Sequence, residues 1–249
     1  MRYKMIFSYR GTDFYGYQVQ NEKRTIQGEI EKILFKLLQE NIRIYASGRT
    51  DRGVHALNQV AIFDVDKELD VERFRHSLNS LLANDIHIKS ICKCDIDFHA
   101  RFSAIGKKYI YEMAIAENEP LNNYGIFYSL KNYDFDIMEK VMELFVGEHD
   151  FKNFCTNKEE ESYVETIFSF KLIKNQNRVT FSIIGSGFKR YMVRMIVGTV
   201  LACGLNKFTY DEVKNKLDSK IRDNVSFKVP PEGLYLSEVY YDKESLNND

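Results

Sequence analysis

Apolar residues recur along roughly the first 95 positions with two different periods. Residues 2–9 alternate between polar and apolar and carry aromatic side chains, which is typical of a β-strand. Thr25 is a suitable N-cap for a helix, because apolar residues then recur at helical spacing as far as Leu38. The other elements predicted in this part are strands at 42–46, 59–65 and 86–94 and a helix at 71–83. The order strand, helix, strand, strand, helix, strand is the split βαβ pattern of α+β sandwiches.

The second part of the chain repeats this mixture of elements. The pattern predicts strands at 107–116, 164–173, 178–184 and 234–241 and helices at 135–146, 191–203 and 209–217. The middle two strands are expected to form a hairpin that turns at 175–177. We therefore predict an α+β fold of two similar α/β sandwich halves with RRM-like or ferredoxin-like sheets, residues 1–105 and 106–249. No Pro-rich or Ser-rich linker separates them, so we expect the halves to share one continuous interface.

Composition excludes several classes of protein. The chain has 249 residues, of which 44% are hydrophobic, so it can bury a large core without disulfides or metals. No apolar run approaches the ~20 residues that a membrane-spanning helix needs, and the first residues lack the apolar core of a signal peptide. The four cysteines are too few and too scattered for a disulfide framework. We therefore expect a soluble, cytoplasmic protein with no membrane partner and with reduced cysteines.

Charge is distributed unevenly along the sequence. The formal net charge of −1 argues against a nucleic-acid partner, because phosphate binding usually requires a basic surplus. However, residues 166–210 carry seven Lys or Arg and no Asp or Glu, whereas residues 134–165 carry ten acidic and three basic residues. A basic face can therefore coexist with a nearly neutral total.

The most unusual polar stretch is residues 47–55, which contain two glycines and lie between two predicted strands. Loops of this kind on a rigid scaffold often carry chemistry. Asp51 lies between Arg49 and Arg52, whose positive field would keep a carboxylate ionised and lower its pKa, as a nucleophile or base requires. The alternative interpretation is a tight surface turn whose charges neutralise one another.

Other motifs in the sequence fail as catalytic or cofactor sites. Ser47, Asp51 and His55 include the residue types of a hydrolase triad, but triad members meet through the fold, and no G-x-S-x-G pattern is present. A dinucleotide fingerprint that begins at Gly185 has Arg190 where its third glycine should be. The five histidines show no H-x-x-x-H spacing, and no Walker motif occurs. The sequence therefore predicts neither a metal nor a cofactor.

Two segments combine cations with features suited to RNA. Strand alternation places Lys107, Tyr109 and Tyr111 on one face, where a cation and aromatic rings could receive phosphate and a base. Residues 185–194 lead into a predicted helix with three cations, and a helix N-terminus adds amide donors for phosphate. The alternatives are an aromatic stripe in the core for the first segment and a solvated basic face for the second.

Taken together, these segments resemble the tRNA pseudouridine synthase A (TruA) family. The matching stretches occur in the family's order from about residue 2 to residue 242 and comprise 9–20, 25–28, 48–56 with 59–60, 98–104 with Tyr109 and Tyr111, 147–151, 187–188 with 192–198, and 231–236. The block Gly-Arg-Thr-Asp-Arg-Gly-Val-His at 48–55 is highly specific by itself.

The resemblance implies the pseudouridine synthase fold with a central basic cleft, and isomerisation of uridine to pseudouridine without metal, nucleotide or redox cofactor. It implies that Asp51 is the catalytic carboxylate. By position, Arg49 matches an arginine that enters the RNA stem and helps to extrude the target nucleotide, and Tyr109 matches a tyrosine that packs on the uracil. Arg194 matches the arginine that orients the aspartate, and Leu234 lies in the apolar pocket wall. The phosphate contacts implied with less support are Lys107, Lys189 and Arg190.

Family members are homodimers that bind the anticodon stem-loop of tRNA and modify uridines at positions 38, 39 and 40. The resemblance therefore implies tRNA as substrate and a second copy of the chain as partner. Two alternatives stay open: a family paralogue that acts on another RNA such as rRNA, and an RNA-binding or RNA-folding module whose catalysis is dispensable.

Overall fold

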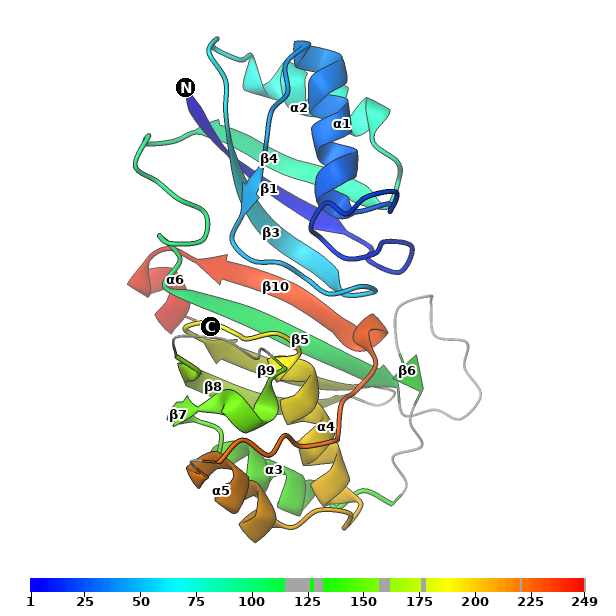
Figure 1. The fold of residues 1–249 in the computed structure, drawn as a ribbon, viewed down its shortest axis with the longest axis vertical. Helices are drawn as coiled ribbons and strands as arrows, with labels where there is room; N and C mark the ends of the chain where they lie inside the picture. The colour runs from blue at the N-terminus through cyan, green and yellow to red at the C-terminus, as the bar shows by residue number, and fades with distance from the viewer. Residues whose placement is uncertain (115–125, 128–131, 157–161, 176–177, 220, 249) are drawn as a thin grey trace. The chain divides into compact units, whose positions relative to one another are not determined.

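The computed structural model describes all residues except 115–125, 128–131, 157–161, 176–177, 220 and 249 (Figure 1). The chain forms two compact units. Unit 1 comprises residues 1–106 and 235–249, and unit 2 comprises residues 107–234. The chain therefore leaves unit 1 after Gly106 and returns to it at Tyr235 for its last strand.

The sheet of unit 1 has the strand order of a split βαβ fold. Its strands are β1 (Arg2–Tyr9), β2 (Tyr45–Ala46), β3 (His55–Asp64), β4 (Ile86–Lys93) and β10 (Leu234–Tyr240). β1 is central and pairs antiparallel with both β3 and β4, while the short β2 pairs antiparallel with β3. β10 pairs parallel with the start of β3, where Tyr235 lies opposite His55. The predicted topology of the first 95 residues is confirmed.

Helices α1 (Ile26–Leu38) and α2 (Val71–Leu81) contact each other, and α2 packs along β4 (Figure 1). Thr25 caps α1 as predicted, because its hydroxyl accepts a hydrogen bond from the Gly28 amide. Every second side chain of β1 is buried. The aromatic rings of Tyr3, Phe63 and Phe74 pack in sequence and join β1, β3 and α2.

Unit 2 repeats the same kind of architecture. Its sheet has the order β5 (Gly106–Ala114), β9 (Arg178–Gly185), β8 (Val164–Asn175), β7 (Gly147–Asp150), with antiparallel neighbours, and β6 (Ile126–Phe127) pairs parallel with β5. The helices are α3 (Phe135–Glu143), α4 (Met192–Gly204) and α5 (Tyr210–Asp218), with 3₁₀ turns at Phe151–Phe154 and Pro231–Gly233. The predicted α+β class with two similar halves is confirmed.

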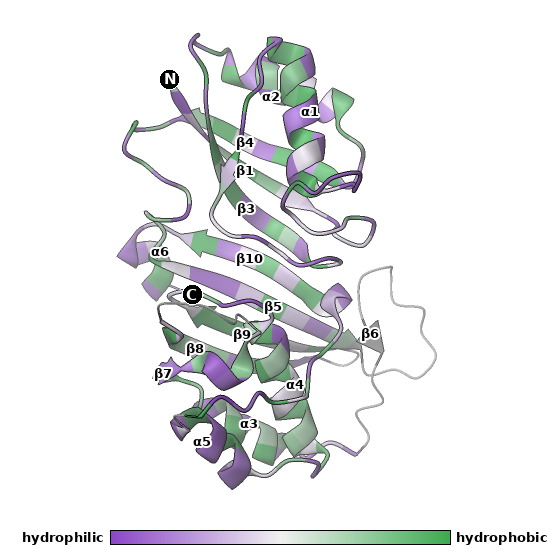
Figure 2. Cartoon of the chain, viewed as in Figure 1, coloured by the Kyte–Doolittle hydropathy of each residue, from purple (hydrophilic) through white to green (hydrophobic). Residues whose placement is uncertain are grey.

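Burial distinguishes the helices of unit 2. Every residue of α4 is buried, and Figure 2 shows this helix as mostly hydrophobic and α5 as mostly hydrophilic. α3 packs against α4 and β8, so α4 lies within the core of the unit. Among the described residues, no helix combines the length and the apolar character that crossing a lipid bilayer requires.

Several elements differ from the sequence-based expectations. The strand expected at 42–46 is confined to Tyr45–Ala46, because the Ile44 amide donates to Glu31 and its carbonyl accepts from Gln27, both on α1. β3 begins four residues earlier than expected, where β10 lies beside it. The strand β7 and the C-terminal helix α6 (Lys243–Asn247) were not anticipated, since both are too short to show a period. The hairpin of β8 and β9 is confirmed, and residues 176–177 of its expected turn lie outside the described residues.

Candidate active site

The polar segment 47–55 connects β2 to β3 and is held from below by buried side chains. The Tyr9 hydroxyl lies 2.8 Å from the Thr50 hydroxyl. The Gln59 side-chain amide donates to the Gly48 carbonyl at 3.1 Å and to the Tyr9 hydroxyl at 3.3 Å. Its carbonyl oxygen accepts from the Ser47 hydroxyl at 2.8 Å. These contacts fix the chain on both sides of residue 49, which an ordinary charged surface turn does not require.

Burial also sets the protonation state of this cluster. Burial raises the pKa of Tyr9 to about 12, and hydrogen bonds with Thr50 and Gln59 offset part of that effect. Burial likewise raises the pKa of Tyr17 well above its usual value. Both phenols are therefore neutral at physiological pH, and the Tyr9 hydroxyl keeps its proton for hydrogen bonding.

Two glycines allow the N-terminal segment to approach the 47–55 loop closely. A Cβ atom on Gly11 would lie 1.9 Å from the Val54 carbonyl oxygen. Gly16 has a φ of +92°, and its Cβ would meet the Thr50 carbonyl at 3.1 Å. The Tyr17 amide donates to that same carbonyl at 3.1 Å. Main-chain contact from residues 11–17 therefore shapes the loop as much as its own sequence does.

His55 has a structural role at the end of the loop. It is 2% exposed, and its Nδ1 accepts a hydrogen bond from the Gly11 amide at 3.1 Å. Its ring stacks on Tyr235 of β10 with 4.7 Å between ring centroids. Because Nδ1 is used as an acceptor and the ring is stacked, the histidine is not arranged as the base of a Ser-His-Asp triad.

The loop presents Arg49 on the surface and leaves Asp51 half-buried. Arg52 is also exposed, and its guanidinium lies 4.4 Å from the Tyr15 ring. The Val54 amide donates to the Asp51 carbonyl, which closes a tight turn over the aspartate. Asp51 and Arg49 both belong to unit 1.

The other six residues predicted for the site belong to unit 2. Tyr109 on β5 is 8% exposed, and its ring meets Phe188 edge to face at 5.1 Å. Lys107 is half-buried on the same strand, opposite Gly185 of β9. Leu234 at the start of β10 is 5% exposed. The shared face that strand alternation predicts for Lys107 and Tyr109 therefore lies on an observed strand.

Arg194 is a buried cation near the start of α4. It is 8% exposed, its Nε donates to the Val229 carbonyl at 2.8 Å, and its guanidinium lies 5.2 Å from the Tyr191 ring. Burying a guanidinium is unfavourable unless its charge and its N–H groups are compensated. A buried arginine fixed by a carbonyl and an aromatic ring is suited to orienting an anionic group.

Lys189 and Arg190 differ in their surroundings. The Lys189 ammonium lies 3.1 Å from the Glu165 carboxylate, which also accepts from the Ser186 hydroxyl. Arg190 is exposed, and its guanidinium stacks on Tyr191 at 4.9 Å and donates to the Tyr191 hydroxyl. The charge of Lys189 is therefore balanced locally by a carboxylate.

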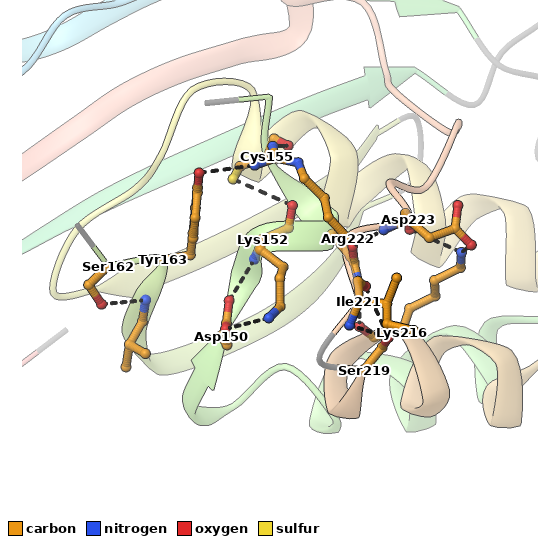
Figure 3. A network of polar contacts seen from close by, with 12 residues as sticks. Asp150, Lys152, Cys155, Ser162, Tyr163, Lys216, Ser219, Ile221, Arg222 and Asp223 are labelled. Carbon is orange, nitrogen blue, oxygen red and sulfur yellow. Dashed lines mark hydrogen bonds and ion pairs between the residues drawn. The ribbon is translucent and has the colours of Figure 1, made fainter. Parts of the chain in front are cut away.

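The chain that follows α5 is pinned by the polar network in Figure 3. Arg222 donates to the Tyr163 hydroxyl and to the Cys155 carbonyl, both at 3.0 Å. The buried Asn153 adds further contacts: its side-chain amide donates to the Lys216 and Ile221 carbonyls, and its backbone carbonyl accepts from the Val225 amide. The residues that lead to Val229, the partner of Arg194, therefore have fixed main-chain positions.

Sequence reasoning did not single out Tyr9, Gln59, Tyr191 or Lys228. Tyr9 and Gln59 sit in predicted strands, where an aromatic or a single polar residue attracts no attention. Tyr191 and Lys228 are brought together by the fold, with 4.4 Å between the ammonium and the ring. In the part of the chain that the structure describes, no three or more His, Cys, Asp or Glu side chains are grouped to hold a metal ion.

Comparison with known proteins identifies the family. The family model for tRNA pseudouridine synthase matches residues 5–103 and 141–242. The tRNA pseudouridine synthase A of Geobacillus sp. (strain WCH70) is 41% identical over 97% of this chain and 98% of its own length. That of Staphylococcus aureus (strain MRSA252) is 35% identical over 100% of this chain and 95% of its own length.

A solved structure of the archaeal box H/ACA sRNP Nop10-Cbf5 complex covers 80% of this chain and 43% of that chain at 12% identity. Its TM-score of 0.34 is too low to carry a conclusion about function. The family model and the full-length relatives do carry one, because they span both units and include the 47–55 loop and α4. The chain therefore belongs to the tRNA pseudouridine synthase family.

Proposed function

We propose that this chain isomerises uridine to pseudouridine in tRNA, with Asp51 as the catalytic carboxylate. The observation that carries the proposal is the construction of the 47–55 loop. Hydrogen bonds from Tyr9 and Gln59 fix Gly48 and Thr50, so the aspartate is presented from a rigid turn. Catalytic groups need such support, because small displacements from the productive geometry reduce rates strongly.

The reaction needs an ionised carboxylate and little else from the protein. The bond between C1′ and N1 breaks, the uracil turns in its pocket, and a bond between C1′ and C5 forms. C5 then loses its proton and N1 gains one, so no oxidant, reductant or metal is consumed. Asp51 acts either by attack at C1′ or by removal of a ribose proton, and both routes require its deprotonated form.

Four companion residues complete the proposal. Arg49 enters the RNA stem and helps to extrude the target nucleotide, which costs a few kcal/mol of unstacking. Tyr109 packs on the everted uracil, and such stacking contributes ~1–3 kcal/mol per base. Arg194 orients the Asp51 carboxylate, and Leu234 forms part of the apolar wall beside the base.

The proposed substrate is the anticodon stem-loop, with uridines at positions 38, 39 and 40 as targets, bound across a basic cleft by a homodimer in the cytoplasm. The printed name of both full-length relatives, tRNA pseudouridine synthase A, supports the choice of tRNA. Recognition of backbone shape suits an enzyme that accepts neighbouring uridines, because reading of base edges would restrict it to one.

The test is release of tritium from an anticodon stem-loop labelled at C5 of uridine. Wild type should release tritium, and Asp51→Ala should release none above background although it still binds the RNA. Asp66→Ala is the matched control, because it removes an exposed carboxylate from the same unit. Absence of release by wild type, or undiminished release by Asp51→Ala, would refute the proposal. Mapping pseudouridines in RNA from cells with and without the protein would then identify the modified positions, and sites confined to rRNA would refute tRNA as substrate.

A further inference from the structure

Three cations surround the ring of Tyr191 in unit 2. The Lys228 ammonium lies 4.4 Å from the ring centroid, the Arg190 guanidinium 4.9 Å and the Arg194 guanidinium 5.2 Å. Because all three contact one ring, any two of these charges lie within about 10 Å of each other. That separation is about one Debye length at 0.1 M salt, so the cations repel one another appreciably.

Tyr191 adopts an unusual backbone conformation to occupy this position. It precedes α4 with φ of 63° and ψ of 2°, in the left-handed region that bulky side chains rarely adopt. Its hydroxyl accepts a hydrogen bond from Arg190, and its ring faces the cations. Residues held in such conformations persist only where surrounding contacts fix them, and they concentrate at functional sites.

Lys228 reaches the same ring from a part of the chain that is distant in sequence. The following residue is tied to α4, because the Val229 amide donates to the Arg194 carbonyl and its own carbonyl accepts from Arg194 Nε. Gly198 of α4 also allows close approach, since a Cβ there would lie 2.9 Å from the Lys228 nitrogen. Lys228 is exposed and, among the described residues, makes no ion pair.

We propose that Arg190 and Lys228, assembled around Tyr191, bind one phosphate of the RNA backbone beside Arg194. This inference rests on the proposed function for its ligand. A polyanion offsets the mutual repulsion of the cations, and a guanidinium fork together with an ammonium group suits phosphate oxygens. Lys189, in contrast, has its charge balanced by Glu165 and contributes less to RNA binding.

The experiment measures the dissociation constant of an anticodon stem-loop RNA at a series of KCl concentrations. Lys228→Ala and Arg190→Ala should each weaken binding several-fold and reduce the slope of log affinity against log salt by about 0.7 to 0.9, the value for one lost phosphate contact. Tyr191→Leu should reduce the slope as well although it removes no charge, because the cations lose the ring that positions them. Tyr191→Phe retains the ring and should keep a slope near that of wild type.

Lys214→Ala is the matched control, because Lys214 is an exposed lysine on α5 of the same unit. Its slope should equal that of wild type, and Lys189→Ala should change the slope less than Arg190→Ala does. Wild-type slopes in both Lys228→Ala and Tyr191→Leu, with thermal melts that show folded protein, would overturn the proposal. A wild type that binds RNA with the expected slope pattern yet releases no tritium would keep the phosphate site and refute the isomerase function instead.

Discussion

At the scale of single residues, the hydroxyl group of Tyr9 has the most consequential position in unit 1. It lies between Thr50 of the 47–55 loop and Gln59 of β3 and is fully enclosed. A buried hydroxyl with two partners stabilises the fold modestly, but its removal leaves both partners with unsatisfied polar groups. The position of the loop therefore depends on an atom that takes no part in the chemistry.

Tyr9→Phe should lower the free energy of unfolding by about 1–2 kcal/mol and slow tritium release roughly tenfold, because Gln59 and Thr50 lose a partner. The raised pKa of Tyr9, to about 12, adds a pH signature. A folded pKa above the unfolded value of about 10 means that the stabilisation is complete below pH 10 and is lost as pH rises through 12. The difference between wild type and mutant should thus be constant from pH 7 to pH 9 and shrink above pH 10.

Urea unfolding of both proteins across that pH range measures the effect. Tyr45→Phe is the control, because Tyr45 is 48% exposed and loss of a surface hydroxyl should change stability by less than about 0.5 kcal/mol. Equal losses in the two variants would contradict the structural role of Tyr9.

At the scale of elements, the helix α4 and the extended chain before η2 (Pro231–Gly233) form a closely packed pair. Gly198 makes this possible, because the Phe227 and Lys228 backbone lies where its Cβ would be. The helix is wholly buried, so it cannot shift outward to relieve a clash.

Gly198→Ala should therefore destabilise the protein although alanine is the better helix former. Alanine gains roughly 0.8–1.0 kcal/mol of helix propensity, whereas overpacking against backbone costs about 1–3 kcal/mol. A lower Tm in thermal melts, together with weaker RNA binding because Lys228 is displaced, is the expected result. Asn215→Ala on the exposed face of α5 is the control, and a Tm for Gly198→Ala at or above that of wild type would show that the contact is loose.

The sequence predicts most elements correctly where a buried face imposes a clear period, as in β1, α1 and the hairpin of β8 and β9. It fails where side chains replace a ladder, as at Ile44, whose backbone is satisfied by Glu31 and Gln27 of α1. Among the site residues, the motif at 48–55 stands out because charged residues and glycines interrupt two apolar strands. Tyr191 and Lys228 could not be predicted, because their proximity depends on a contact across 37 positions that no local pattern records.

At the scale of the whole molecule, unit 1 is built from two separate stretches of chain. Its last strand, β10, pairs with β3 at the residues that end the 47–55 loop, and Tyr235 stacks on His55. The Tyr241 hydroxyl donates to the Ala100 carbonyl at 2.7 Å, which ties the end of the chain to the loop before β5. The final helix α6, in contrast, buries none of its residues.

Two truncations separate these contributions. Deletion of residues 243–249 removes only exposed surface and should shift Tm by less than about 2 °C. Deletion of residues 234–249 removes β10 and exposes the edge of β3, so unit 1 should lose cooperative unfolding and RNA isomerisation should disappear. Thermal melts and tritium release measure both, and similar melting curves for the two truncations would contradict the structural importance of β10.

The interrupted course of unit 1 also has a consequence during synthesis. Ribosomes deliver the chain from its N-terminus at about 5–20 residues per second, and the segment that supports His55 emerges only after the whole of unit 2. A nascent polypeptide therefore holds an immature catalytic loop until translation is nearly finished. Premature termination anywhere before that segment yields a product unable to modify RNA, so activity itself reports that the message was read almost to its end.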